Sequence, residues 1–130
     1  MADTGIFVIE ASWVIPVDPP GLLPDHAVVV SDGRILELLP TRAARARYPG
    51  MRRVDLAGHA LIPGLINLHT HAAMTLMRGL ADDRALMDWL QNHIWPVERR
   101  LVSTDFVHDG TLLACGEMLR GGITCFNDMY

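Results

Sequence analysis

A continuous apolar run at residues 61–66 leads directly into the sequence Asn67-Leu68-His69-Thr70-His71. Apolar runs without alternation are typical of strands that are buried on both faces, as in parallel sheets covered by helices. Because successive side chains of a strand point to opposite faces, His69 and His71 are predicted to lie on the same face. The feature therefore predicts a buried parallel strand that carries two imidazoles at its carboxyl end.

Residues 1–60 contain short segments that favour β-structure and are separated by turn residues. These segments are residues 6–9, 12–17, 27–30, 35–39, 53–56 and 59–62. Asp32-Gly33 occupies the two-residue turn position of a hairpin. Residues 41–48 predict a short helix, with Thr41 as its N-cap and Pro49-Gly50 as its end. The pattern predicts a β-meander, followed by a helix and two further strands.

The residues after the histidine pair show helical patterns and then a strand pattern. Residues 86–94 place apolar side chains at helical spacing until Pro96 interrupts the pattern. A second helix is predicted to begin near Ser103 and to end at Gly121-Gly122, and residues 123–130 have a strand pattern. A strand followed by helices and another strand predicts a parallel sheet with helices packed on it.

Charge and hydropathy exclude several classes of partner. The chain has a net charge of −4, with 11 basic and 15 acidic residues, and its basic clusters are no longer than Arg52-Arg53 and Arg99-Arg100. Such a chain lacks the basic surface that binds the phosphates of nucleic acids. It also lacks an apolar run of about 18 residues, which a membrane span needs, and an export signal at its start. We therefore expect a cytoplasmic protein without nucleic-acid or membrane partners.

The stretch from Pro63-Gly64 through the two histidines resembles the amidohydrolase superfamily, in which a strand-borne His-x-His opens a (β/α)8 TIM barrel. Residues 69–79, with Trp89 and Glu98 further on, resemble the deaminases of 5′-methylthioadenosine and S-adenosylhomocysteine within that superfamily. The resemblance implies an α/β fold with a small N-terminal β-sandwich. Residues 1–60 would be the N-terminal part of that β-sandwich composite domain. Residues 61–130 would be the first part of the barrel, which we expect to continue beyond this chain.

The resemblance implies hydrolytic deamination of adenine nucleosides such as 5′-methylthioadenosine and S-adenosylhomocysteine. In this reaction a water molecule activated by a metal ion attacks the ring carbon that bears the amine. His69 and His71 are the implied ligands for one Zn²⁺ (zinc) ion per subunit, and two imidazoles also suit iron, cobalt or nickel. The other ligands and the acid–base residues of the superfamily lie on later strands, so we assign no catalytic residue here.

Trp89 and Glu98 are the implied substrate-binding residues. By resemblance the indole of Trp89 packs against the nucleoside, and the carboxylate of Glu98 accepts hydrogen bonds from two ribose hydroxyls. Each residue also has a simpler interpretation. Trp89 lies on the apolar face of a predicted helix, and Glu98 precedes Arg99 and Arg100, with which it would form a surface ion pair. Asp128, near the end of the last strand, is predicted to support the site without binding metal.

Two other functions stay open on the sequence. Another amidohydrolase of the same branch, such as a guanine deaminase, a cytosine deaminase or a triazine hydrolase, would share the histidine pair. A non-catalytic fragment that only binds metal would share it too, because the sequence identifies two ligands and no proton shuttle. The leading hypothesis predicts a small nucleoside as the partner. A homo-oligomer stays open, because relatives commonly pair.

Overall fold

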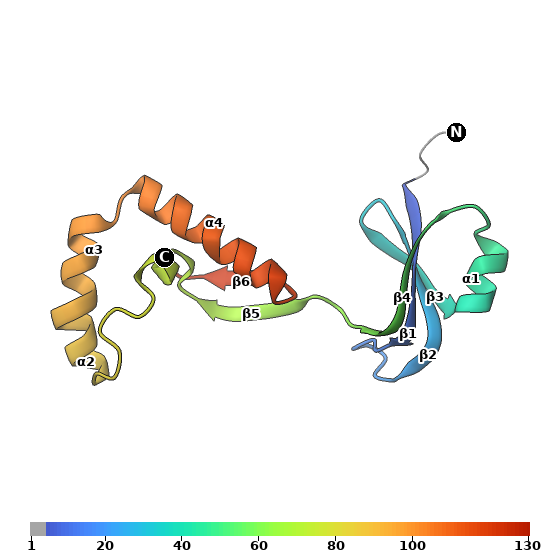
Figure 1. The fold of residues 1–130 in the computed structure, drawn as a ribbon, viewed down its shortest axis with the longest axis horizontal. Helices are drawn as coiled ribbons and strands as arrows, with labels where there is room; N and C mark the ends of the chain where they lie inside the picture. Colours follow the sequence, from blue (N-terminus) through green and yellow to red (C-terminus); the bar gives the residue numbers. More distant parts are fainter. Residues whose placement is uncertain (1–4) are drawn as a thin grey trace. The chain divides into compact units, whose positions relative to one another are not determined.

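The computed structural model of this chain describes residues 5–130, and Figure 1 shows its ribbon. The chain divides into two compact units, Met1–Pro63 and Gly64–Tyr130. The first unit is built mainly from a four-stranded sheet, and the second from helices and a two-stranded sheet. The two sheets have no strand in common, so each unit has its own framework.

The sheet of the first unit has the strand order β3-β2-β1-β4. Its strands are β1 (Ile6–Val14), β2 (Leu23–Ser31), β3 (Arg34–Pro40) and β4 (Arg52–Leu61). The first three are antiparallel neighbours, as in a meander, but β4 lies parallel to β1. The predicted meander is therefore limited to β1, β2 and β3, because the chain crosses over through α1 (Thr41–Arg47) before β4 begins.

Two pairs of predicted short strands are single strands in the structure. Residues 6–9 and 12–14 belong to β1, and the Ala57-Gly58 position lies inside β4. Gly58 has a φ of 76°, its N–H donates to Ser12 Oγ at 2.7 Å, and the pairing of β4 with β1 shifts register in this region. The glycine therefore makes an irregularity within one strand, in the manner of a β-bulge, instead of a turn between two strands.

The local turn and cap chemistry of this unit is partly as predicted. Asp32 has a φ of 50° and Gly33 a φ of 74°, which is the geometry of a two-residue hairpin turn. The hairpin prediction is thus confirmed. The predicted helix cap is wrong, because Thr41 is the first residue of α1, its N-cap is Pro40, and no side chain caps the helix.

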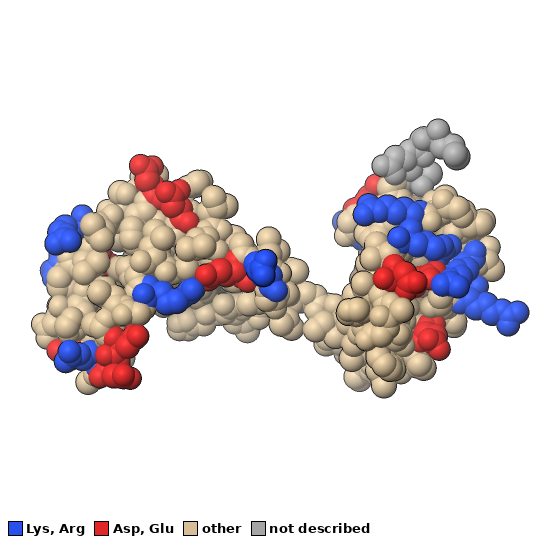
Figure 2. All heavy atoms as spheres, viewed as in Figure 1, with Lys and Arg blue, Asp and Glu red and all other residues tan. Residues whose placement is uncertain are grey.

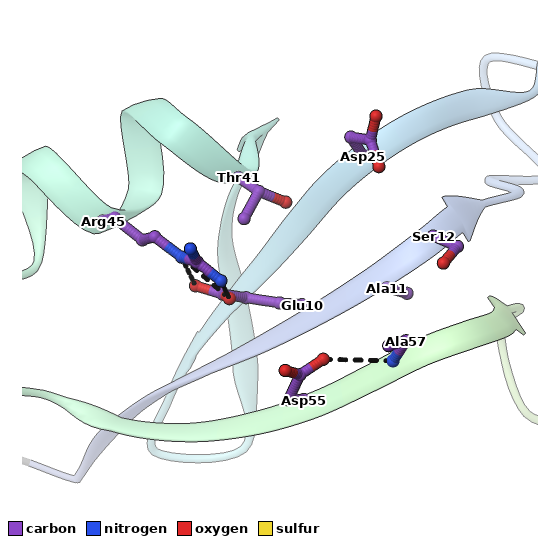
Figure 3. A pocket seen from close by; sticks show the side chains of 8 residues that line it. All are labelled: Glu10, Ala11, Ser12, Asp25, Thr41, Arg45, Asp55 and Ala57. Atoms are coloured by element: carbon purple, nitrogen blue, oxygen red, sulfur yellow. Dashed lines mark hydrogen bonds and ion pairs between the residues drawn. The ribbon is translucent and has the colours of Figure 1, made fainter.

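Besides a buried cluster of Ala11, Val14 and Val28, the first unit has a core cluster between α1 and the sheet. Its fully buried residues are Val8, Ala27, Val29 and Ala44. Glu10 is also buried, and its carboxylate accepts from Arg45 at 2.6 Å and from Arg53 at 2.7 Å. Figure 3 shows Glu10 and Arg45 side by side at the wall of a polar cavity of about 220 Å³. These two ion pairs compensate the buried charge. In Figure 2, basic side chains of this unit lie beside acidic ones.

The second unit contains β5 (Leu65–Thr70) and β6 (Ile123–Asp128), which pair in parallel. The elements between them are η1 (Ala72–Met77), α2 (Leu86–Asp88), η2 (Trp89–Ile94), α3 (Trp95–Leu101) and α4 (Thr104–Arg120). In Figure 1, α4 runs beside the two strands, and it contacts β6. The predicted parallel pairing with helices in the connection is confirmed.

The prediction that Pro96 interrupts the helix is wrong. Residues 86–101 are helical throughout, since α2 passes into the π-helical segment η2 and Pro96 then lies in the first turn of α3. In a regular α-helix proline removes one hydrogen bond, and its ring clashes with the carbonyl one turn earlier. The wider π-helical turn accommodates the ring. The helical stretch 86–101 therefore carries both Trp89 and Glu98.

The ends of α4 are as predicted. Ser103 Oγ accepts from the N–H of Phe106 at 3.1 Å, which caps the first turn. Gly122 has a φ of 81° directly beyond the last turn, where a left-handed residue ends many helices. In the part of the chain that the structure describes, neither α4 nor any other helix is long and apolar enough to cross a membrane.

The apolar run at residues 61–66 differs from the expectation of one strand buried on both faces. It is divided between the end of β4 and the start of β5. Leu65, Ile66 and Leu68 are 49%, 64% and 77% exposed. Burial on both faces requires neighbouring strands and covering layers on each side. Among residues 5–130, β5 pairs with β6 alone, which leaves these side chains accessible.

Candidate functional site

His69 and His71 lie at the carboxyl end of β5, the first within the strand and the second directly after it. The centroids of their rings are 5.3 Å apart, and the two Nε2 atoms are 3.3 Å apart. The prediction that both imidazoles lie on one side of the strand is confirmed. The strand thus presents two ring nitrogens that converge on one place.

Hydrogen bonds from neighbouring side chains hold the backbone around this pair. Oδ1 of Asn67 accepts from the N–H of His69 at 3.1 Å. Oδ1 of Asp128, on β6, accepts from the N–H of Ala72 at 3.0 Å. Asp128 therefore ties the residue that follows His71 to the adjacent strand, which is a supporting contact of the kind that the sequence predicts for it.

The segment that leaves the histidine pair packs tightly against α4. Ala72 and Ala73 are buried, and a Cβ atom on Gly110 of α4 would lie only 2.5 Å from the carbonyl oxygen of Ala73. Glycine is required there, because any side chain would keep η1 and α4 apart. Arg78 then donates to both carboxylate oxygens of Glu117 on α4, at 3.0 and 2.5 Å. These contacts fix η1 in place beside the histidines.

A pocket of about 390 Å³ lies next to His71. Most of its wall is apolar and comes from η1, from the helical stretch 86–101 and from the residues after β6. The lining residues are His71, Met74, Leu86, Trp89, Leu90, Ile94, Trp95, Glu98, Met129 and Tyr130. Three of the residues singled out in the sequence, His71, Trp89 and Glu98, thus share one pocket, whereas His69 lies outside its lining.

Trp89 contributes to the pocket wall from the π-helical segment. Its indole Nε1–H donates to the carbonyl oxygen of Leu80 at 3.1 Å. The one polar atom of the side chain is therefore satisfied, which fixes the orientation of the ring. The aromatic surface that remains is part of the pocket lining.

Glu98 lies on α3 and contacts a residue that the sequence did not suggest. Its Oε1 accepts from the hydroxyl of Tyr130 at 2.8 Å. Within residues 5–130, Glu98 forms no ion pair with Arg99 or Arg100, so the simpler interpretation of this carboxylate is not observed. Burial, the hydrogen bond and the charge of Glu98 raise the pKa of Tyr130 to about 12, so the phenol stays a donor at neutral pH.

Sequence reasoning missed Tyr130, although a signal for it existed. Tyr130 follows β6, and the carboxyl ends of parallel strands lie at the same edge of a sheet. A polar residue at the end of β6 was therefore a candidate for the same site as the histidines at the end of β5. Its partner, Glu98, lies 32 residues earlier in the sequence, and no short-range pattern connects the two.

The histidine pair fits one divalent metal ion. Two ligands at about 2.0–2.1 Å from a tetrahedral zinc ion lie roughly 3.3–3.4 Å from each other. The separation of the two Nε2 atoms, 3.3 Å, agrees with that spacing. Residues 5–130 contain no group of three or more His, Cys, Asp or Glu side chains that could hold an ion. The described residues therefore offer two imidazole nitrogens at the spacing of two metal ligands.

Comparison with known proteins gives matches along nearly the whole chain. Residues 60–130 match the Amidohydrolase family. The chain is 52% identical over 124 residues to a 5-methylthioadenosine/S-adenosylhomocysteine deaminase of Saccharophagus degradans. The aligned part covers 95% of this chain and 28% of that protein. It is 44% identical over 131 residues to a 5′-deoxyadenosine deaminase of Methanosarcina mazei, and this alignment covers 100% of this chain and 28% of that protein. The chain thus spans about 28% of the length of these curated relatives.

Solved structures show the same arrangement of elements. An adenosine deaminase from Xanthomonas campestris with bound zinc is 54% identical, with a TM-score of 0.93 over 95% of this chain and 28% of that one. The guanine deaminase of E. coli is 17% identical, with a TM-score of 0.77 over 93% of this chain and 30% of that one. At the lower identity the likeness shows a common fold and nothing more. The α/β arrangement of this chain is therefore one that these solved deaminases share.

Proposed function

The chain belongs to the amidohydrolase family, and from that membership we propose that it serves the metal-dependent hydrolytic deamination of adenine nucleosides such as 5′-methylthioadenosine and S-adenosylhomocysteine. The observation that carries the proposal is the convergence of two histidine Nε2 atoms to 3.3 Å beside a pocket that also contains Trp89 and Glu98. Curated relatives that are named for deamination of such nucleosides support the substrate class.

We also propose the finer architecture that the family suggests. Residues 61–130 would be the first part of a (β/α)8 barrel, and residues 1–60 part of a β-sandwich composite domain. The parallel pairing of β5 with β6 supports the first assignment, since barrel strands are all parallel. The carboxyl edge of these strands is the side at which such barrels carry their active sites, and the histidine pair lies at that edge.

His69 and His71 are assigned as two ligands of a divalent ion, with zinc as the first choice because the similar adenosine deaminase contains zinc. When bound, such an ion supplies a water molecule with a pKa of about 7, which is a nucleophile at neutral pH. Asn67 and Asp128 serve this site by holding the backbone on either side of the two ligands. Both side chains accept from backbone N–H groups, of His69 and of Ala72, so they fix the course of the chain at the two imidazoles.

Glu98 and Trp89 are assigned to the nucleoside. A carboxylate has two oxygens with several acceptor positions, and only Oε1 of Glu98 is used by Tyr130 among the described residues. The other oxygen is available to the adjacent hydroxyls of a ribose. Trp89 offers an aromatic surface in the same pocket. A largely apolar pocket with polar groups at His71 and at Glu98 suits a flat base that is attached to a diol.

The proposal is tested by the deamination of 5′-methylthioadenosine by the natural gene product with zinc, followed through the absorbance change of the purine. Glu98→Ala is expected to raise the KM for nucleosides about tenfold or more, because a lost hydrogen bond to a charged group costs about 1.5–3 kcal/mol. The KM for free adenine, which lacks ribose, should not change. Glu37→Ala is the matched control, since Glu37 also accepts from a tyrosine, Tyr48, at 2.9 Å, but in the first unit.

The alternatives give different results in the same assay. A KM for nucleosides that is unchanged in Glu98→Ala rejects the ribose role. Turnover of guanine, cytosine or a triazine in preference to adenosine favours another member of the branch. Binding of zinc without turnover of any of these compounds favours a non-catalytic role.

A further inference from the structure

Tyr130 and Glu98 form a polar pair within the mostly apolar pocket. The phenol donates to Oε1 of the carboxylate at 2.8 Å, and both side chains line the pocket next to His71. The two residues come from different elements, because Glu98 lies on α3 and Tyr130 follows β6. The contact therefore joins the helical stretch 86–101 to the edge of the sheet that carries the histidines.

The backbone beside Tyr130 is held by the same carboxylate that supports the histidine pair. Oδ1 of Asp128 accepts from the N–H of Ala72 at 3.0 Å and from the N–H of Met129 at 3.0 Å. The N–H of Met129 also lies 3.2 Å from the carbonyl oxygen of Thr70 on β5. A short series of contacts thus runs from the residue after His71, through Asp128, to the residue before Tyr130.

The hydrogen bond limits the freedom of a flexible side chain. A glutamate has several rotatable bonds and loses rotamer entropy when it is held in one conformation. Hydrogen bonds to an ionised acceptor are stronger than neutral ones and hold their geometry better. In the described part of the chain, Tyr130 is the residue that donates to the Glu98 carboxylate, and it leaves Oε2 for a ligand. Burial, the hydrogen bond and the charge of Glu98 raise the pKa of Tyr130 to about 12, so its hydroxyl is a donor at neutral pH.

We propose that Tyr130 is the positioning residue of the substrate site, which holds the Glu98 carboxylate at a fixed place relative to the histidine pair so that its free oxygen meets the ribose hydroxyls. This inference rests on the proposed role of Glu98 in binding nucleosides. Tyr130 acts through Glu98 and makes its contribution to binding of the ribose, not to the chemical step. Removal of the Tyr130 hydroxyl should therefore leave the KM unchanged for substrates that lack the ribose hydroxyls.

The test compares Tyr130→Phe with Tyr48→Phe in the natural gene product. Both variants remove one hydroxyl that donates to a glutamate, at 2.8 Å for Tyr130 and at 2.9 Å for Tyr48, but only Tyr130 lines the pocket. Tyr130→Phe is expected to raise the KM for adenosine about tenfold, with kcat within about twofold. The KM for 2′,3′-dideoxyadenosine should stay the same, and Tyr48→Phe should change neither constant.

A double variant keeps the result interpretable if Tyr130→Phe lowers stability. In Glu98→Ala/Tyr130→Phe the KM for adenosine should equal that of Glu98→Ala alone, because the two residues act as one unit. An equal rise in KM for both nucleosides, a loss confined to kcat, or additive effects in the double variant would each overturn the positioning role. The proposed function fails separately, namely if Glu98→Ala itself leaves the KM for adenosine unchanged.

Discussion

At the scale of single residues, Glu10 shows how a buried carboxylate is kept charged. It is 4% exposed, and Arg45 donates to it through Nε at 3.1 Å and through Nη2 at 2.6 Å. Arg53 donates to the other oxygen at 2.7 Å. A buried charge without partners would cost several kcal/mol, so both guanidinium groups are part of the fold of the first unit. The hydrogen bond from Arg45, followed by the charges of both arginines, lowers the pKa of Glu10 in spite of its burial.

The pH dependence of the first unit should follow from this pairing. Because the pKa of Glu10 is lower in the folded chain than its ordinary value of 4.5, the pairing stabilises the fold fully above that pH. The stability is lost as the pH falls through the lower, folded value. Arg45→Gln should raise the pKa of Glu10 in a carboxyl NMR titration, and should flatten the acid dependence of urea unfolding. Arg47→Gln is the control, since Arg47 pairs with Glu37 instead, and an unmoved pKa in Arg45→Gln would contradict this account.

The residues of the candidate site differ in how far the sequence predicts them. The convergence of His69 and His71 follows from strand alternation, a local rule that needs no knowledge of the rest of the fold. Trp89 and Glu98 could be selected only through resemblance, because helical spacing alone favours packing and ion pairs. Tyr130 could not be paired with Glu98 in advance, since their contact depends on where β6 places its end against α3.

At the scale of elements, the sequence predicts the ends of helices where they depend on local chemistry. It does not predict whether a glycine or a proline interrupts a strand or a helix, because that depends on the neighbouring structure. The cap at Ser103 and the left-handed Gly122 are local, and both were predictable. A glycine with positive φ serves a turn and a β-bulge equally well, so the partner strand β1 decided the role of Gly58. Proline kinks or ends a regular helix, and at Pro96 the π-helical segment before it decided that the helical stretch continues.

The contact between η1 and α4 gives a testable prediction at this scale. A methyl group on Gly110 would lie 2.5 Å from the oxygen and 2.9 Å from the Cα of Ala73, which are backbone atoms that cannot rotate away. Gly110→Ala should therefore lower the free energy of unfolding by about 1–3 kcal/mol. Gly116→Ala, in the same helix with nothing within 4 Å, should raise it by about 0.5–1 kcal/mol. Urea unfolding measures both, and equal effects of the two substitutions would show that the close approach is unimportant.

At the scale of the whole molecule, the two units differ in how completely they bury their apolar residues. The first unit has a cluster of fully buried side chains beneath α1 and a second buried cluster of Ala11, Val14 and Val28. The second unit exposes Leu65, Ile66 and Leu68 on β5, whose apolar run predicted burial on both faces. The apolar pattern shows that β5 is suited to burial on both faces. The two-stranded sheet of residues 5–130 does not cover both faces of this strand.

The polypeptide of residues 1–130 should bind zinc through its histidine pair without deaminating adenosine. Two imidazoles with Nε2 atoms 3.3 Å apart are spaced to bind one ion. Catalytic zinc sites commonly use three protein ligands, however, and residues 5–130 contain no group of three. Competition with a chromophoric chelator measures the affinity for zinc, which should be at least tenfold lower in His69→Ala than in the unsubstituted polypeptide. His59→Ala is the control. His59 belongs to the first unit, and its Nδ1 lies 2.9 Å from the carbonyl oxygen of Ala57. Turnover by this polypeptide, or zinc affinity that survives His69→Ala, would contradict a site that is shared between this pair and further ligands.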